Sequence, residues 1–359
     1  MKAFQINALS KARTCSGVTL EARNRLRLGW RNGVTIAFKD RFVHFDPSRK
    51  LGKDCTVFIS HAHADHLSKL SSEADSYLTP ETFDIASVIQ GKTPVKAIPL
   101  GFNQTLELDE FEITAHNAGH MLGSAQFELR SSDSVVVYTG DINCRNMFTT
   151  SAAESIQCDS LILETTYGVP YYTFPDLTIT CSEIVEWALQ QIKAGRIPVF
   201  RAYSGGKAQE LVKIFNVMTN IPVIAEGAVA GITEAYMRNG VNLNYFNSAS
   251  TEARELLKTG ECVCISSQDH GVAGLANSSL AVATGWALGK RFQRREAAFP
   301  LSSHADFDQL IEYVKQARPR EVITVHGFKE EFAAYLRRKL GVKAHSISPL
   351  QQDSLTEFF

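Results

Sequence analysis

The sequence predicts an α/β fold, and three stretches of the chain support this interpretation. The first 165 residues contain a succession of short apolar runs that are typical of strands. From about residue 180 such runs alternate with segments of helical spacing. From about residue 298 the chain returns to short loops that carry His, Ser and Asp. We therefore expect a second α/β unit to be inserted into the first.

The strands expected in the first part end at polar residues. Pro47 and the polar residues after it end one apolar run and leave Asp46 at a strand end. The run Thr56-Val57-Phe58-Ile59 leads directly into a loop with several histidines. We expect strands over residues 33–38, 42–47, 55–60, 97–100, 111–116, 125–129, 135–139 and 161–163.

Helices and strands are expected to alternate in the middle of the chain. Residues 182–192 show helical spacing, with an N-cap at Thr180 or Ser182. The expected series continues with a strand over 197–203, a helix over 206–217, a strand over 221–225 and a helix over 233–238. A βαβα series of this kind predicts a parallel sheet.

The composition describes an ordinary globular protein. With 359 residues, 44% of them hydrophobic, the chain is long enough for one large domain or two of average size. The formal net charge of −1 means that an anionic polymer would have to bind to a local basic patch. No apolar run approaches the roughly 20 residues of a membrane-spanning helix, and the amino terminus does not resemble a leader peptide. We expect a soluble, unprocessed protein.

The seven cysteines are odd in number and scattered, which does not match the disulfide framework of a secreted domain. A reducing cytoplasm fits this pattern. Cys262 and Cys264 are separated by one residue, which could indicate a metal site. Their surroundings are more typical of alternation along a strand, so we interpret both thiols as structural.

A metal centre is the most specific prediction from the sequence. His61, His63, Asp65 and His66 place four candidate ligands within six positions, and His120 and Asp141 follow later in the chain. Imidazole and carboxylate together suit zinc. More ligands than one tetrahedral ion can use indicate two ions that share a bridging group. The alternative is a chance gathering of unrelated histidines.

These ligands divide into two expected sites that share Asp141. The first site takes His61, His63, His120 and Asp141, and the second takes Asp65, His66, Asp141 and a histidine from late in the chain. Asp46 is expected to accept the free ring N–H of a ligand histidine and so to fix its tautomer. An ordinary turn aspartate before Pro47 is the competing interpretation.

The motifs around these ligands resemble those of a known superfamily. Residues 61–66, 119–124 and 139–141 are similar to successive motifs of the metallo-β-lactamase superfamily. Glu164, His304 and His326 lie in segments that resemble three further motifs of the β-CASP nucleases. The resemblance implies an αββα sandwich with an inserted α/β domain between the first and second of these later motifs.

The resemblance also implies domain boundaries and residue roles. The metallo-β-lactamase domain would comprise residues 1–167 and 298–359, and the β-CASP domain residues 168–297. His326 would complete the second zinc site, and Asp65 would act in catalysis as well as in binding. His304 would protonate the leaving oxygen, with Glu164 keeping its imidazole charged and oriented. Taken alone, each of these two residues could equally be structural.

Candidate substrate contacts lie in the second half of the chain. Ser204, Gly205, Gly206 and Lys207 join a strand to a helix and could receive a phosphate, although an ordinary turn would also explain the glycines. A cluster of four cations around Phe292 could bind backbone phosphates or be a solvated surface. It consists of Lys290, Arg291, Arg294 and Arg295. Further candidates, which could instead pack between domains, are Arg201, Tyr167, Tyr171, Tyr172 and Tyr203.

Residues 118–126, 203–209, 284–287 and 301–306 look like the compact exonuclease branch of the family. That branch contains DNA-ligase-associated exonucleases and archaeal proteins related to messenger-RNA 3′-end processing factors. We therefore expect a two-zinc nuclease, with manganese as an alternative activating metal. It would cut single-stranded nucleic acid as an exonuclease in DNA repair or processing. A DNA ligase or a helicase is a candidate partner.

Three alternatives remain open at this point. The first is an exo- or endoribonuclease of the messenger-RNA 3′-end processing type, because a histidine at position 326 does not distinguish the two polymers. The second is a metal-binding subunit of a processing complex without activity of its own. The third, a hydrolase of small thioesters or lactams, conflicts with Glu164, His304 and the large insert. Polarity of degradation, oligomeric state and the role of residues 1–30 are left undetermined.

Overall fold

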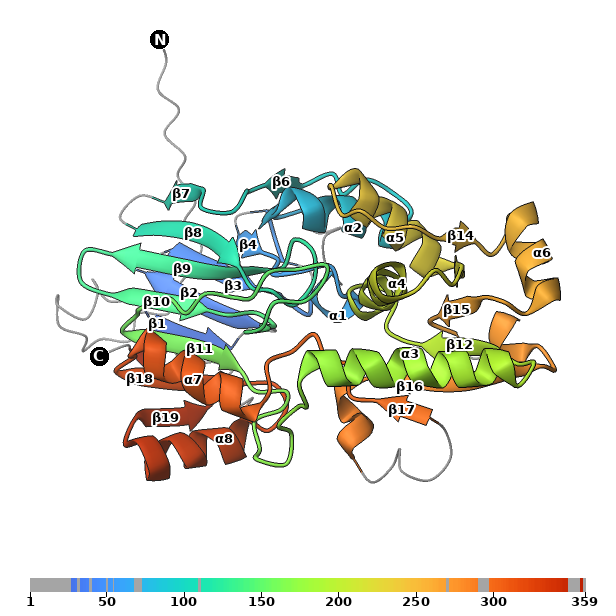
Figure 1. Ribbon diagram of the computed structural model, residues 1–359. Helices are drawn as coiled ribbons and strands as arrows, with labels where there is room; N and C mark the ends of the chain where they lie inside the picture. Colours follow the sequence, from blue (N-terminus) through green and yellow to red (C-terminus); the bar gives the residue numbers. More distant parts are fainter. Residues whose placement is uncertain are drawn as a thin grey trace, which may run out of the picture.

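The computed structural model contains two facing sheets and a third sheet that lies to one side of them (Figure 1). It describes residues 27–30, 33–38, 41–49, 51–53, 55–67, 73–108, 111–268, 271–289, 297–347 and 356–357. The predicted cationic cluster, Lys290, Arg291, Arg294 and Arg295, lies outside the described residues, as do the first 26 residues. Among the described helices none is both long and apolar enough to cross a membrane.

The first sheet has the strand order β20-β1-β2-β3-β4-β5-β6. The strands from β20 to β3 are antiparallel neighbours, and those from β3 to β6 are parallel. The bounds are β1 Arg27–Trp30, β2 Val34–Phe38, β3 Arg41–Phe45, β4 Thr56–Phe58, β5 Asp75–Leu78, β6 Ala97–Pro99 and β20 Thr356–Glu357.

The second sheet has the order β19-β18-β11-β10-β9-β8-β7. Its strands change from antiparallel, β7 to β10, to parallel, β10 to β19. The bounds are β7 Thr105–Leu108, β8 Phe111–Asn117, β9 Ala125–Ser131, β10 Val135–Tyr138, β11 Ser160–Glu164, β18 Glu321–Val325 and β19 Lys343–Ser346.

The two sheets bury an aromatic core between them. Phe45 and Phe58 from the first sheet meet Phe127 from the second, with ring centroids 5.6 and 5.1 Å apart. All three side chains are inaccessible to solvent, as expected for inward-facing positions of two packed sheets. The apolar runs that predicted these strands thus supply the side chains of this core.

Helices cover the outer faces and complete the αββα sandwich. α1 (Ala64–Leu67) and α2 (Pro80–Gln90) pack on the first sheet, where Ile85 joins the buried cluster around Val57. α7 (Phe307–Ala317) and α8 (Lys329–Tyr335), continued by the π-helical turn η4 (Leu336–Leu340), cover the second sheet. The predicted sandwich is confirmed.

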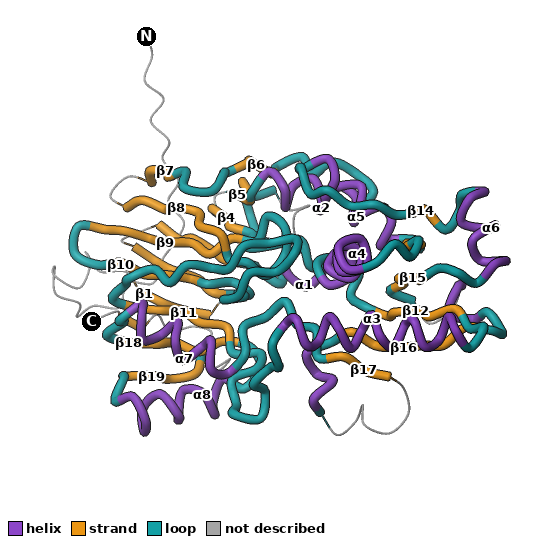
Figure 2. Tube along the Cα trace, in the orientation of Figure 1, coloured by secondary structure: helices purple, strands orange, loops and turns teal. Residues whose placement is uncertain are grey.

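The third sheet is parallel throughout, as predicted, with the order β14-β13-β15-β12-β16-β17. Figure 2 shows its strands beside α3 and α4. The strand bounds are β12 Ile197–Arg201, β13 Val223–Ala225, β14 Phe246–Asn247, β15 Val263–Ser266, β16 Ser278–Ala283 and β17 Ala297–Phe299. The helical bounds are α3 Leu177–Lys193, α4 Lys207–Met218, α5 Ala228–Arg238, α6 Thr251–Thr259, η2 Gly271–Gly274 and η3 Gly285–Leu288.

Two helices of this unit begin earlier than the sequence predicts. The N-cap of α3 is Asp176, whose carboxylate accepts the Thr178 N–H at 2.8 Å, and neither Thr180 nor Ser182 caps it. Thr180 instead lies buried in the first turns. α5 begins five residues before the predicted position, after Gly227 with φ 55°. A carboxylate cap and a left-handed glycine thus override the apolar periodicity that the prediction used.

The third sheet also reaches past the predicted domain boundary at residue 297. β17 pairs with β16 through Phe299, and the Phe299 ring packs near Trp187 and Phe200, with centroids 6.0 Å from each. Phe299 is therefore part of the buried cluster that includes residues of the third sheet. Cys264 in β15 and Cys262 just before it are buried and form no disulfide, in agreement with a structural role.

Candidate metal centre

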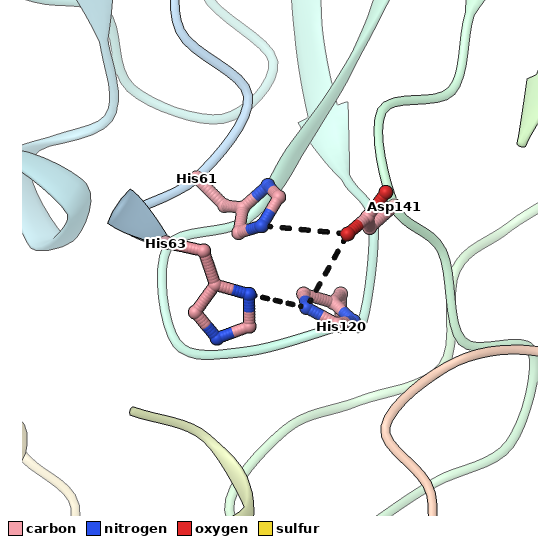
Figure 3. A group of neighbouring side chains, drawn as sticks. All are labelled: His61, His63, His120 and Asp141. Atoms are coloured by element: carbon pink, nitrogen blue, oxygen red, sulfur yellow. Dashed lines mark hydrogen bonds and ion pairs between the residues drawn. The ribbon is translucent and has the colours of Figure 1, made fainter. Parts of the chain in front are cut away.

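Three loops bring the first set of predicted ligands to one point. His61 and His63 follow β4, His120 lies between β8 and β9, and Asp141 follows β10. One ligand atom from each of these four residues lies within 4.8 Å of the others, and all four residues are buried (Figure 3). The β4 loop is held in place from both sides, because Ile59 N donates to Tyr77 O and Ala125 N donates to Ser60 O.

The outward-facing ring nitrogens determine the tautomers of two of these histidines. His120 Nδ1–H donates to Ser303 O at 2.8 Å, and His63 Nε2–H donates to Gly205 O at 3.2 Å. The inward-facing nitrogens, His120 Nε2 and His63 Nδ1, then carry lone pairs and lie 3.1 Å apart. Two lone pairs at this separation repel each other unless a cation binds between them.

His61 completes the argument for a cation. Its Nε2 is buried without a hydrogen-bond partner among the described residues and lies 3.5 Å from Asp141 Oδ2. Burial, together with neighbouring imidazoles, holds the pKa of His61, His63 and His120 well below the usual range. Neutral imidazoles around a carboxylate form a donor set that suits zinc, so the residues present fit a metal ion.

A second group of residues approaches Asp141 from another side. His66 Nε2 lies 3.8 Å from Asp141 Oδ2 and 3.7 Å from Asp65 Oδ2. Its other nitrogen, Nδ1, lies 2.9 Å from Asp46 Oδ2. Burial opposes a charge on His66, yet Asp46 and Asp141 outweigh it and raise the pKa to about 10. The nitrogen facing Asp141 therefore carries a proton unless a metal ion replaces it.

Asp46 is held firmly in this position. It adopts a left-handed backbone conformation with φ 45° and accepts hydrogen bonds from Ser60 N at 2.7 Å, Ser60 Oγ at 2.6 Å and Tyr138 Oη at 2.8 Å. Burial would raise the pKa of Asp46, but His66 and the two donors of Ser60 lower it. The carboxylate thus contacts a candidate ligand histidine, as the sequence predicts.

Asp65 and His326 lie at the edge of the centre. Both line the same cavity as Asp141, but neither belongs to the groups of described residues whose ligand atoms lie within 4.8 Å of one another. The His326 ring centroid is 6.0 Å from that of His66. His326 has φ 59°, and Gly327 after it lies so close to the Thr166 backbone that a Cβ would meet Thr166 Cα at 2.4 Å.

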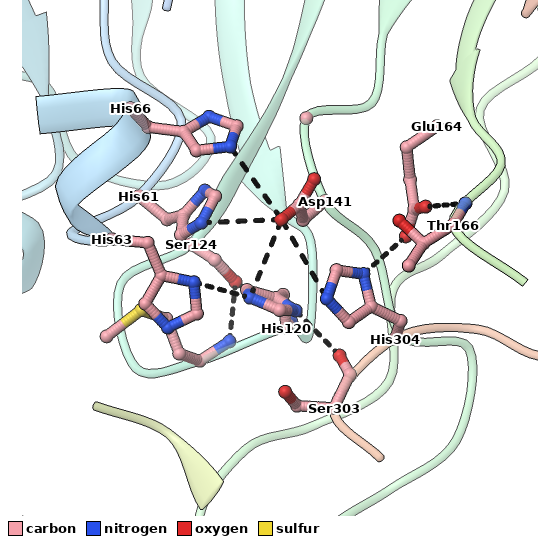
Figure 4. Close-up of polar contacts among 12 residues, drawn as sticks. His61, His63, His66, His120, Ser124, Asp141, Glu164, Thr166, Ser303 and His304 are labelled. Atoms are coloured by element: carbon pink, nitrogen blue, oxygen red, sulfur yellow. Dashed lines mark hydrogen bonds and ion pairs between the residues drawn. The ribbon is translucent and has the colours of Figure 1, made fainter. Parts of the chain in front are cut away.

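His304, which is partly exposed, and the buried Glu164 form a pair beside the metal centre (Figure 4). His304 Nδ1 lies 2.9 Å from Glu164 Oε1, and its Nε2 lies 4.0 Å from Asp141 Oδ2. Glu164 also accepts the Thr166 N–H at 2.8 Å. Burial disfavours charge on both groups, but their mutual attraction raises the pKa of His304 and lowers that of Glu164.

A cavity of about 700 Å³ connects this centre to the inserted domain. Arg201, Ser204 and Lys207 line it from the carboxyl end of β12 and the start of α4. Lys207 Nζ donates to Ser303 Oγ at 3.5 Å, and burial lowers the pKa of Lys207 to about 8 even though Asp141 opposes this. The carboxyl edge of a parallel sheet, where ligands commonly bind, thus faces the metal centre.

Several residues predicted to contact the substrate do not line the cavity, and several residues that do line it had no predicted role. Gly205 and Gly206 pack against Met121, where an added Cβ would meet its side chain at 3.2 and 3.3 Å, instead of lining the cavity. Tyr171 and Tyr172 do not line it either, whereas Tyr167 and Tyr203 do. Lining residues for which the sequence analysis predicted no role include Thr166, Ser267, Thr284 and Trp286. The signal for Trp286 and Thr284 was the resemblance of residues 284–287 to the exonuclease branch, which gave neither residue a role.

Comparison with known proteins supports the resemblance to the β-CASP nucleases that the sequence motifs indicate. Residues 296–347, which include His304 and His326, match the Zn-dependent metallo-hydrolase RNA specificity domain. A probable DNA ligase from Opitutus terrae is 31% identical over 81% of this chain. Transcription termination factor FttA from Methanosarcina mazei is 23% identical over 82%, and an RNase J-like protein from Methanocaldococcus jannaschii is 24% identical over 76%. The chain belongs to the β-CASP family of the metallo-β-lactamase superfamily.

The β-CASP chain covers very different shares of these relatives. It spans 28% of the probable DNA ligase, 62% of the termination factor and 81% of the RNase J-like protein. Among solved structures, a protein of unknown function from Enterococcus faecalis superposes with a TM-score of 0.65 at 16% identity. The match covers 93% of this β-CASP chain and all of that protein, and it supports the fold.

Proposed function

We propose that this β-CASP protein is a metal-dependent nuclease that hydrolyses phosphodiester bonds of single-stranded nucleic acid. One observation carries the proposal: the cluster of neutral histidines and the charged His304–Glu164 pair converge on Asp141, which lines a cavity together with His63 and His304. A ligand set for a Lewis acid and a separate proton donor are the two requirements of phosphodiester hydrolysis. The domain arrangement, a sandwich interrupted by the third sheet, follows the family.

The residues that would hold the metal ions form two sets with Asp141 in common. We assign His61, His63, His120 and Asp141 to one zinc ion and Asp65, His66, Asp141 and His326 to the other. When bound, the ions would polarise a phosphate oxygen and make a water molecule more acidic. Asp46 would keep His66 in the tautomer that presents Nε2 to the centre.

His304 is the residue that we assign to protonation of the leaving oxygen. Its Nδ1 is engaged by Glu164, so that Nε2, which faces Asp141, is the atom that presents a proton to the cavity. Glu164 stabilises the imidazolium through charge and fixes the plane of the ring. The raised pKa keeps His304 protonated near neutral pH. A water molecule made more acidic by the metal ions would also be able to attack the phosphodiester in this pH range.

The cavity wall opposite the metal centre would bind the sugar–phosphate backbone. Lys207 and Arg201 place positive charge near the start of α4, whose amino terminus favours an anion. Ser204 adds a hydroxyl donor in the same loop. Because the overall net charge is −1, this local group and the metal ions would supply the attraction for a polyanion.

An exonuclease for DNA ends is the form of the activity that we favour. The relative at 31% identity is a probable DNA ligase, and the chain aligns with 28% of its length. The match to a ligase supports the proposal that this protein prepares DNA ends for ligation, with a DNA ligase or a helicase as its partner. The alternative is a ribonuclease, which the match of residues 296–347 to an RNA specificity domain and the RNase J-like relative both favour. In either case we place the protein in the cytoplasm.

The test is a time course on 5′-labelled and 3′-labelled single strands of DNA and RNA with matched sequence. Wild-type protein and Asp141→Asn would be compared with zinc, with manganese and with a chelator, after metal content has been measured for each. Shortening of one polymer from one end by the wild type alone would establish substrate, polarity and metal dependence. Two bound metals per chain without cleavage of any strand would reject the nuclease and favour a non-catalytic subunit.

A further inference from the structure

We propose that Trp286 and Tyr203 form a base-stacking site in the wall of the cavity, which binds an unpaired nucleobase of any identity. The proposal rests on the proposed function, because it names the feature of a nucleic acid that the same cavity would recognise. Trp286 lies in η3 and Tyr203 lies two residues after β12. Both residues line the cavity that contains Asp141 and His304.

Both rings are unusually accessible for aromatic residues in a concave site. Trp286 is 39% exposed and Tyr203 is 47% exposed. Aromatic side chains usually bury most of their surface, and an accessible ring in a binding cavity gains free energy when a flat partner covers it. The face of a nucleobase is such a partner.

The topology of the third sheet places Tyr203 and Trp286 at the same edge of that sheet. β12 and β16 are neighbouring parallel strands, with Arg201 opposite Val282 near their carboxyl ends. Tyr203 and Trp286 follow these two ends by two and three residues respectively. Since parallel strands end at a common edge, both side chains lie along the edge that faces the metal centre.

Trp286 is held in a rigid aromatic frame. Its ring centroid lies 4.8 Å from that of Tyr167, 5.1 Å from Tyr172 and 6.2 Å from Phe328. The backbone before it lies directly on Tyr167, because a Cβ on Gly285 would meet the Tyr167 hydroxyl oxygen at 2.4 Å. A ring that is already fixed loses little conformational entropy when it binds a base.

The aromatic residues around Trp286 also connect it to His304, the proposed proton donor. The Tyr167 ring lies between them, with its centroid 5.8 Å from that of His304. A base stacked on Trp286 would therefore belong to a nucleotide on the leaving-group side of the cleaved bond. Tyr203 lies on the metal side, since its ring centroid is 4.4 Å from that of His63. Lys207 Nζ lies 5.8 Å from the Tyr203 centroid, so a phosphate bound by Lys207 would place its own base near this ring.

Stacking of this kind selects single strands without reading sequence. Every base has a π face, so aromatic platforms tolerate any base, but in a duplex both faces are already covered by neighbouring bases. The strand that enters the cavity must therefore be unpaired at the cleaved bond. The proposed site adds this requirement to the charge-based binding by Arg201 and Lys207.

The experiment measures binding of the full-length protein, with zinc present, to fluorescent phosphorothioate single strands that resist hydrolysis. One strand is intact and the other carries an abasic position next to the end that is cleaved. We expect Trp286→Ala to weaken binding of the intact strand about tenfold and Trp286→Phe by less than about threefold. The wild type should bind the abasic strand about tenfold more weakly than the intact strand. Trp286→Ala should bind the abasic strand no more weakly than the intact strand.

The outcomes separate the two proposals. If Trp286→Ala still distinguishes the intact strand from the abasic one as well as the wild type does, the stacking site is rejected, while cleavage by the wild type leaves the nuclease proposal standing. If the wild type neither binds nor cuts any strand, both proposals fail. Thermal melting of each variant checks folding, and should Trp286→Ala not fold, equal affinity of wild type for both strands rejects the site.

Discussion

His304 Nδ1 lies 2.9 Å from Glu164 Oε1, although the two residues are separated by 140 positions in the sequence. The glutamate ends a central strand of the second sheet, and the histidine precedes α7 after the chain has returned from the inserted domain. Glu164 is fully buried, so its charge acts on His304 without the screening that water provides. The return of the chain to the sandwich thus completes the proposed proton donor.

Replacement of Glu164 by Gln should slow hydrolysis and change its pH dependence. We expect kcat to fall about 10- to 100-fold, because general acid catalysis contributes factors of about 10² to 10⁴ and only the orientation and charge of His304 are lost. Glu164 raises the pKa of His304, so its removal lowers that pKa, and the alkaline limb of the rate profile should move to lower pH. Rates between pH 5 and 10 at saturating zinc would measure both effects. An unchanged alkaline limb would exclude His304 as the proton donor.

Asp46→Asn should weaken metal binding although Asp46 is not a proposed ligand. The substitution removes the charge that holds His66 through Nδ1 at 2.9 Å, and partners of this kind typically contribute 10- to 100-fold to metal affinity. Competition with a zinc chelator, followed by metal analysis, would measure the loss. Tyr138→Phe is the matched control, because it removes one donor to Asp46 and leaves the contact with His66 intact. Equal affinity of both variants and wild type would show that Asp46 is only structural.

Glu210 should contribute strongly to stability because it fastens a loop of the sandwich to α4. Its carboxylate accepts hydrogen bonds from Phe148 N at 2.6 Å, Thr149 N at 3.0 Å and Thr149 Oγ at 2.7 Å. Glu210→Ala leaves these donors unpaired and should lower the free energy of unfolding by about 3 kcal/mol. Thr149→Val removes one donor and should cost about 1 kcal/mol. Denaturant unfolding with both variants tests this order, and equal losses would contradict it.

Glu321 should make stability depend on pH in the acid range. Lys343 Nζ lies 3.0 Å and His345 Nδ1 3.4 Å from its carboxylate. Burial opposes the charge, but these two partners lower the pKa of Glu321 below its unfolded value of about 4.3. The stabilisation is therefore present above about pH 4.3 and is lost as the pH falls through the lower folded pKa. In Glu321→Gln the difference in stability between pH 6 and pH 3 should shrink, and an unchanged difference would contradict this.

Local patterns in the sequence predicted much of the architecture. Short apolar runs over residues 125–129 and 135–139 indicated β9 and β10, and the strand–helix series after residue 196 indicated a parallel sheet, which the structure confirms. The predicted start of α3 was wrong, because the capping carboxylate of Asp176 lies outside the apolar pattern on which the prediction was based. Element ends depend on single hydrogen bonds, whereas element types depend on many residues at once, so types are predicted better than ends.

The sequence by itself determined the fold class and the chemical nature of the candidate site, because both follow from residue types at fixed short spacings. His61, His63 and His66 are close in the chain and must share one loop wherever it lies. Only the tertiary structure decided which nitrogen of each ring faces the centre, and that Trp286 stands in the cavity wall near His304. The hydrogen bonds that orient His63 and His120 join loops more than one hundred residues apart. They depend on how three sheets pack, which no local pattern specifies.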